Sequence, residues 1–136
     1  MQRRSQQRGG TVVEAAVCFL VFFTLLMGVL EFGRAYNIYQ ILTDAAREGA
    51  RYSVAPLQGT SALPSTSDVA ARVQTFLDSG NVTGSTVSVN QSVAATVNGV
   101  PLVYTEVDVS APYQFVFFPF GTVTMSTSAV MRNENN

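Results

Sequence analysis

Residues 11–33 read TVVEAAVCFLVFFTLLMGVLEFG, a long and almost uncharged apolar run. It holds one charged residue near its start, Glu14, and no other until Glu31. A helix from Gly10 to Leu30 would rise about 31 Å, at about 1.5 Å per residue. This length matches the hydrocarbon core of a bilayer, and a helix that is apolar on every face has no polar side to present to water. The stretch therefore predicts a membrane-spanning helix.

Positive charge lies in excess on the N-terminal side of this stretch. Arg3, Arg4 and Arg8 precede it, and the first ten residues contain no acid. After it the charges cancel over Glu31, Arg34, Asp44, Arg47, Glu48 and Arg51. The arginine excess predicts a cytoplasmic N-terminus and an exported remainder. The competing interpretation is a cleaved signal peptide, which the length of the apolar run and the lack of an A-x-A-like site disfavour.

Composition limits the possible functions. The chain has 136 residues, of which 47% are hydrophobic and 12% charged, with a net charge of −1. This balance gives no electrostatic case for binding nucleic acid. The single cysteine, Cys18, allows no intrachain disulfide, and histidine is absent. Common zinc sites and nucleophile–base pairs cannot be built from such a chain. We therefore expect a protein that is not an enzyme and that binds no cofactor, metal ion or small-molecule substrate.

The helical pattern continues after Gly33. Apolar or small residues follow one another three or four apart, which lines one side of a helix: Ala35, Ile38, Leu42, Ala45, Gly49 and Tyr52. Pro56 disfavours helix at the residue before it, so the pattern predicts one helix from Thr11 to Val54, about 66 Å long. The small residues Ala45, Ala46, Gly49 and Ala50 are candidates for close helix packing, either onto the chain's own sheet or against another subunit.

The remainder reads as a small α+β domain. A Ser-, Thr-, Gly- and Pro-rich loop is predicted at Leu57–Ser67, and a short helix at Asp68–Ser79 capped by Thr66 or Ser67. From Val82 onward valines alternate with polar residues, which predicts strands.

The turn signal Asn98-Gly99 lies between two such strands. We expect a three-residue loop at Val97–Gly99, because it pairs Val93 with Val103 and Val89 with Val107. A last strand is predicted at Thr122–Met131. The resulting fold is a long N-terminal helix, one short helix and an antiparallel sheet of three to five strands. Its parts are a basic cytoplasmic leader at 1–10, a transmembrane and projecting helix at 11–55, and an exported domain at 56–136.

An aromatic segment, APYQFVFFPFG, precedes the last strand. Five aromatic residues lie within it, more than a small sheet can bury: Tyr113, Phe115, Phe117, Phe118 and Phe120. An exposed apolar patch marks an interaction surface. The alternative is a strand that crosses beneath the long helix.

Glu14 is unusual because an ionised carboxylate inside hydrocarbon is costly unless it is paired. It either lies solvated at the headgroup level or has a function. The sequence RGGTVVEA around it resembles a prepilin signal, in which glutamate is the fifth residue after the cut. That resemblance places the cut between Gly9 and Gly10. The new amino group at Gly10 could then pair with Glu14 of a neighbouring subunit and set the register of a filament.

The first 55 residues or so resemble the TadE-like pilus assembly proteins of the tight-adherence (Flp) system. The best-matching parts are Arg8-Gly9, Glu14, Glu31-Phe32-Gly33-Arg34 and the run AAREGARY at 45–52. Ala15 departs from the family, which commonly has an aromatic residue there.

The resemblance implies a minor pilin or pseudopilin of a type IV pilus in the bacterial inner membrane. It also implies processing by a prepilin peptidase, and partners among other pilin subunits and pilus assembly platform proteins. The protein would assemble through its N-terminal helix and could enter an extracellular pilus. The alternative is a bitopic inner-membrane protein with an exported binding module that never enters a filament.

Overall fold

The computed structural model describes residues 4–57 and 62–133, and their side chains from residue 9 onward. Its elements are the helices α1 (Arg4–Val54) and α2 (Thr66–Ser79) and the strands β1 (Thr86–Val97), β2 (Val100–Gln114) and β3 (Thr122–Arg132). The strands form one antiparallel sheet in the order β1-β2-β3. This arrangement confirms the predicted α+β fold.

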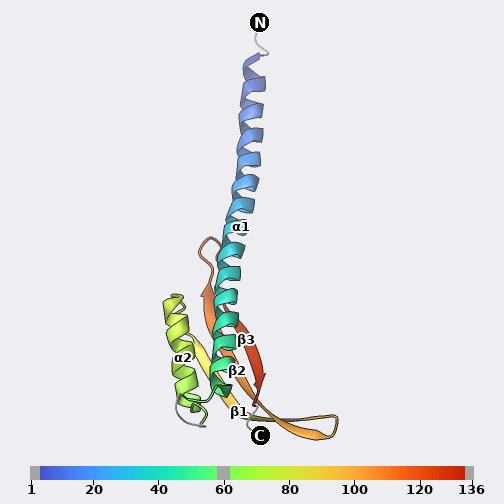
Figure 1. Ribbon diagram of the computed structural model, residues 1–136. Coiled ribbons are helices and arrows are strands. Elements are labelled where there is room, and N and C mark those ends of the chain that lie inside the picture. The colour runs from blue at the N-terminus through green and yellow to red at the C-terminus, as the bar shows by residue number, and fades with distance from the viewer. Residues whose placement is uncertain (1–3, 58–61, 134–136) are drawn as a thin grey trace.

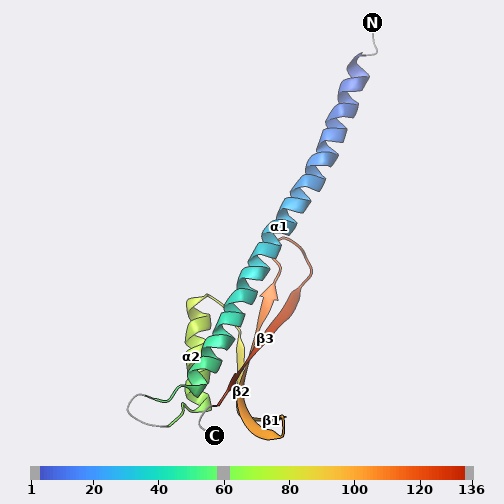
Figure 2. The same cartoon turned by 45° about the vertical axis from the view of Figure 1, so that its right-hand side comes forward.

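The two halves of α1 have different surroundings. The C-terminal half lies beside the sheet and α2, and the N-terminal half extends away from the rest of the chain (Figures 1 and 2). Every residue from Gly9 to Leu26 is exposed. The helix ends at Val54, as predicted, but it begins at Arg4 and not at Thr11. Gln and Arg are good helix formers, so the predicted leader is helical in its described part, and Gly9 and Gly10 do not interrupt it.

Both helices cover one face of the sheet, α1 over β2 and β3 and α2 beside β1. The core between them consists mainly of small and β-branched residues: Leu42, Ala45, Ala46, Ala50, Val69, Val73, Leu77, Val107, Val109 and Ala111. The candidate packing residues Ala45, Ala46, Gly49 and Ala50 are therefore buried against the chain's own α2 and sheet. Of the two alternatives for these residues, the structure shows packing within the chain.

Helix α2 begins earlier than predicted. Its N-cap is Ser65, whereas Thr66 or Ser67 was expected. The Ser65 hydroxyl accepts the Asp68 N–H at 3.2 Å, and the Asp68 carboxylate accepts the Ser65 N–H at 3.2 Å. This reciprocal capping box satisfies two free backbone donors, which explains why the earlier serine is used. The predicted loop before α2 includes residues 58–61, which lie outside the described residues.

The β1–β2 hairpin turns over two residues and not over three. Asn98 and Gly99 have φ angles of 52° and 79°, and a two-residue type I′ turn requires positive φ at both positions. With this loop Val93 pairs with Tyr104, so the predicted pairing of Val93 with Val103 is wrong.

A β-bulge then shifts the register by one residue. Gln91 and Ser92 together oppose Thr105, between the pairs on either side. The predicted pairing of Val89 with Val107 is confirmed, because the bulge compensates for the shorter loop.

Contacts from distant parts of the chain hold this bulge. The Gln91 side chain donates to the Pro64 carbonyl at 2.9 Å, and the Gln91 carbonyl accepts from the Asn133 side chain at 3.2 Å. Thr105 in turn donates to the Asn133 side chain at 2.9 Å. The bulge therefore links the segment before α2 to the end of β3.

Candidate functional site

The apolar half of α1 contains a segment long and apolar enough to cross a membrane. Among the described residues, α1 is the only helix with such a segment, and no part of its most apolar 18-residue stretch is buried. An all-round apolar surface without protein cover is compatible with membrane anchoring.

The predicted leader and cleavage residues lie on this half of α1. Gly9 and Gly10 are consecutive helical residues, and a Cβ atom added to either would meet nothing within 4 Å. Arg3 lies outside the described residues, and the side chains of Arg4 and Arg8 are not among those described. Glu14 is exposed, and no other group in the described ranges pairs with its carboxylate.

Glu31 has the opposite environment, directly after the apolar run. It is 3% exposed, although it is charged. The Tyr113 hydroxyl donates to its Oε1, and the backbone N–H groups of Val116 and Phe117 donate to its Oε2 at 3.1 and 3.0 Å. Arg34 Nη1 lies 2.8 Å from Oε1. The carboxylate is thus fully bonded, which is how a buried charge is retained.

Tyr113 completes this cluster. It is 1% exposed, and its hydroxyl also lies 3.2 Å from the Glu31 carbonyl oxygen. The Arg34 guanidinium lies over its ring, 5.5 Å from the centroid. We call Glu31, Arg34, Tyr113 and the N–H groups of Val116 and Phe117 the Glu31 clamp, because together they join α1 to the end of β2.

The clamp shifts the acid–base behaviour of both buried groups. The Tyr113 hydrogen bond, together with the N–H groups and Arg34, lowers the pKa of the Glu31 carboxyl, although burial acts in the opposite direction. Burial, and then the bond to Glu31, raises the pKa of the Tyr113 hydroxyl. At neutral pH the carboxylate is therefore the acceptor and the phenol the donor.

In the sequence alone, Glu31 counts only as one charge in the balance after the apolar run and as part of the motif Glu31-Phe32-Gly33-Arg34. Two features of the sequence indicate that the Glu31 carboxylate has a binding partner. A carboxylate directly after an apolar run needs a partner, and the Glu31–Arg34 spacing of three places both on one side of a helix. The other partners lie 82 to 86 residues away in sequence, so local spacing could not identify them.

The aromatic segment separates into a buried and an exposed part. Tyr113 does not belong to an exposed patch, since it is in the core. Phe115 and Phe118 are half-buried, whereas Phe117 and Phe120 are exposed. The alternative, a strand beneath α1, holds only for residues 111–114, which are the end of β2. Residues 115–121 form the loop to β3.

Ring contacts hold this β2–β3 loop together. Phe115 meets Phe120 edge to face with centroids 5.6 Å apart, and Phe118 stacks on Phe120 at 5.5 Å. The Phe115 N–H donates to the Gly121 carbonyl at 3.4 Å, across the base of the loop. The loop is therefore an ordered apolar structure with Val116, Phe117 and Phe120 facing outward.

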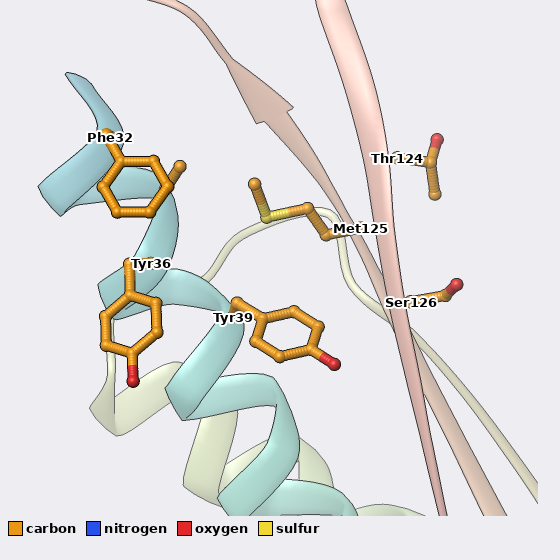
Figure 3. Close-up of a pocket in the computed structure, with 7 residues that line it drawn as sticks. Phe32, Tyr36, Tyr39, Thr124, Met125 and Ser126 are labelled. Carbon is orange, nitrogen blue, oxygen red and sulfur yellow. The ribbon is translucent and has the colours of Figure 1, made fainter. Parts of the chain in front are cut away.

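An open groove runs between α1 and the edge strand β3 (Figure 3). Its volume is about 450 Å³, and its lining residues are Phe32, Ala35, Tyr36, Tyr39, Thr124, Met125 and Ser126. The Met125 side chain points toward the helix, whereas Thr124 and Ser126 point away from it (Figure 3). Phe32 and Tyr36 stack with centroids 6.3 Å apart. Aromatic side chains thus line the helix side of the groove. Elsewhere too, within residues 4–57 and 62–133, no group of three or more His, Cys, Asp or Glu could hold a metal ion.

Comparison with known proteins gives one match. Residues 9–51 match a family model described as TadE-like protein. No curated protein matches the chain. No solved structure matches it either. The matched segment contains the apolar run, Glu14, Glu31 and most of the AAREGARY run, the features on which the resemblance rests. The resemblance is thereby confirmed over this segment: residues 9–51 of the chain are similar to TadE-like proteins, a family associated with the Tad pilus.

Proposed function

We propose that this protein is a minor pilin or pseudopilin of a Flp/Tad-type type IV pilus. In this proposal α1 anchors it in the bacterial inner membrane with the N-terminus in the cytoplasm and the domain exported. It assembles when α1 packs against the helices of neighbouring subunits. The role is structural and not catalytic, in keeping with a chain that has no histidine and one cysteine.

One observation carries this proposal, an exposed apolar stripe along α1. Its members are spaced alternately four and three residues apart: Cys18, Phe22, Leu25, Val29, Phe32, Tyr36 and Tyr39. All seven are exposed. Such spacing is typical of a helix that packs along its length against another helix. The stripe runs over the 22 residues from Cys18 to Tyr39, about 32 Å of helix.

The stripe continues past the part of α1 that lipid would cover. Within the bilayer every face is apolar, so a stripe there carries little information. Phe32, Tyr36 and Tyr39 lie beyond Leu30, at the level of the exported domain, and the domain leaves them exposed. A contiguous apolar surface of this kind in water marks a protein interface. The small residues at 45–50 are covered by the chain itself. The apolar surface that the projecting part of α1 leaves exposed is therefore this stripe.

Photocrosslinking tests this packing. We expect benzoylphenylalanine at Phe22 or Phe32 to form adducts with pilus subunits in cells that express the whole assembly system. Leu20 and Leu30 are matched controls, because each is an exposed apolar residue two positions before its partner and so lies on the opposite side of the helix. Equal adduct yields at the four positions would contradict assembly through the stripe.

Shearing distinguishes the alternative function. A subunit of a filament is released with sheared filaments, whereas a bitopic protein with a binding module stays with the membranes. Adducts at Phe22 together with membrane retention would indicate a helix that packs within the assembly platform and does not enter the filament.

Processing between Gly9 and Gly10 is part of the same proposal. Glu14 is exposed and lies one helical turn before Cys18, near the side of the stripe. A free amino group at Gly10 of one subunit would then pair with Glu14 of the next and remove the cost of a carboxylate in lipid. We expect mass spectrometry of the mature protein to find Gly10 at the N-terminus. Any other N-terminus would remove the basis for this pairing.

A further inference from the structure

We propose that the β2–β3 loop is a second membrane contact, in which Val116, Phe117 and Phe120 enter the interfacial region of the leaflet on the exported side. The inference rests on the proposed anchoring of α1 and adds to it a surface of the exported domain. The occupant of this surface is the lipid boundary between headgroups and acyl chains.

The β2–β3 loop lies at the level where α1 leaves its apolar run. Glu31 follows Leu30, the last residue of the apolar run, so a bilayer that covers Gly10–Leu30 has Glu31 at its headgroup level. Glu31 binds the N–H groups of Val116 and Phe117 at 3.1 and 3.0 Å. These bonds hold the loop at the depth of the helix exit. Both ribbon views place the loop beside α1, at the end of the sheet nearest the apolar half (Figures 1 and 2).

The surface of the loop is apolar. Its sequence, FVFFPFG at 115–121, contains no charged residue. Val116 is 63% exposed and Phe120 is 69% exposed, and Phe117 is exposed beside them. Protein segments that lie in a membrane interface bury phenylalanine and aliphatic side chains at the headgroup–acyl boundary. The loop therefore has the surface that this layer of the bilayer accepts, and the depth at which to meet it.

The loop is also ordered before any contact with a membrane. Stacked and edge-to-face rings fix Phe115, Phe118 and Phe120 relative to one another, and the bond from Phe115 to Gly121 closes the base. An ordered loop loses little conformational entropy when it inserts. Two fixed points of contact, α1 and the loop, would set the tilt and rotation of the domain on the membrane. An aromatic loop far from the bilayer could not set this tilt and rotation.

An environment-sensitive label tests the insertion in full-length protein in liposomes. NBD on Val116→Cys in a Cys18→Ser background reports the loop. NBD on Val100→Cys in the same background is the matched control, because Val100 is also a valine and is 55% exposed. It is the first residue of β2, whereas the β2–β3 loop follows the last residue of that strand. NBD on Cys18 of the otherwise unchanged chain reports whether α1 spans the bilayer.

We expect the label at position 116 to show blue-shifted emission, quenching by lipids with a shallow doxyl group and protection from aqueous iodide. The label at position 100 should remain open to iodide. A label at position 116 as open to iodide as that at position 100 would overturn the inference, while deep-doxyl quenching at Cys18 would leave the anchoring intact. Absence of quenching at Cys18 would instead overturn the anchoring itself. Protection at position 116 that disappears when the protein is diluted in lipid would show a second copy as the occupant and would also overturn the inference.

Discussion

Replacing Glu31 with alanine is expected to detach the β2–β3 loop from α1 and to destabilise the folded α+β domain more than any other change of a charged side chain. The N–H groups of Val116 and Phe117 lose their acceptor at once. The Tyr113 hydroxyl loses the carboxylate and keeps only the backbone carbonyl of residue 31, at 3.2 Å, as an acceptor. Arg34 loses its counterion in the same step. Removing one member of a buried hydrogen-bonded cluster costs the desolvation of every group left behind.

Comparing Tyr113→Phe with Glu31→Ala shows how much each of these two residues of the Glu31 clamp contributes to the free energy of unfolding. Tyr113→Phe removes one hydrogen bond to a charged acceptor and is expected to lower the free energy of unfolding by about 1.5–3 kcal/mol. Glu31→Ala should exceed it. Unfolding of the full chain in detergent can be followed by near-UV circular dichroism of the tyrosines, and release of the loop by chymotrypsin cleavage within 115–120.

Glu48→Ala is the control for the loss of a glutamate from α1. Glu48 also pairs with an arginine, Arg72 at 3.2 Å, but both side chains are partly exposed. Such a surface pair contributes about 0–1 kcal/mol. If Glu31→Ala lost no more stability than Glu48→Ala, the clamp would have no structural importance.

Acid gives an independent check on the clamp. Because the folded state lowers the pKa of Glu31 below its ordinary 4.5, the stability from its carboxylate is complete above that value and is lost as the pH falls through the folded pKa. Asp68 behaves in the same direction, since its hydrogen bonds with Ser65 lower its pKa. The difference between the wild type and Glu31→Gln isolates the part due to Glu31, and it should shrink as the pH falls below 4.5.

The long helix and the order of the elements followed from the sequence because their causes are local. The apolar run requires a helix in lipid, Pro56 ends it, and alternation of valines with polar residues predicts strands. The exact hairpin register did not follow. It depends on a bulge that Pro64 and Asn133 hold through hydrogen bonds, and neither lies near the turn in sequence.

The candidate site, too, was predicted only in part. The aromatic segment was identified as a possible surface, yet Tyr113 within it is buried, because its hydroxyl finds a carboxylate on α1. A count of aromatic residues cannot distinguish a ring with a polar partner from a ring without one. The apolar stripe on α1 could not be predicted from the sequence, for a different reason. In an all-apolar helix no face stands out, and only the positions that the folded domain leaves uncovered define it.

Replacing Gly49 with alanine is expected to destabilise the domain, although alanine is the better helix former by about 1 kcal/mol. A Cβ atom at this position would overlap with Val73 Cγ2 and lie 3.2 Å from Val107 Cγ1. Val73 is β-branched and lies on helix α2, so its χ1 has one strongly preferred rotamer and cannot turn aside. The two helices must then move apart, and overpacking of this kind costs about 1–3 kcal/mol.

Gly33→Ala is the matched control, because it makes the same change on the same helix where an added Cβ would meet nothing within 4 Å. It should raise the free energy of unfolding by up to about 1 kcal/mol, so the two substitutions have opposite signs. Val73→Ala opens space where the new methyl group would go, and the double variant with Gly49→Ala should be more stable than the sum of the two single effects predicts. Additive effects, or stabilisation by Gly49→Ala alone, would mean that α1 and α2 are not in the close contact that leaves room only for glycine.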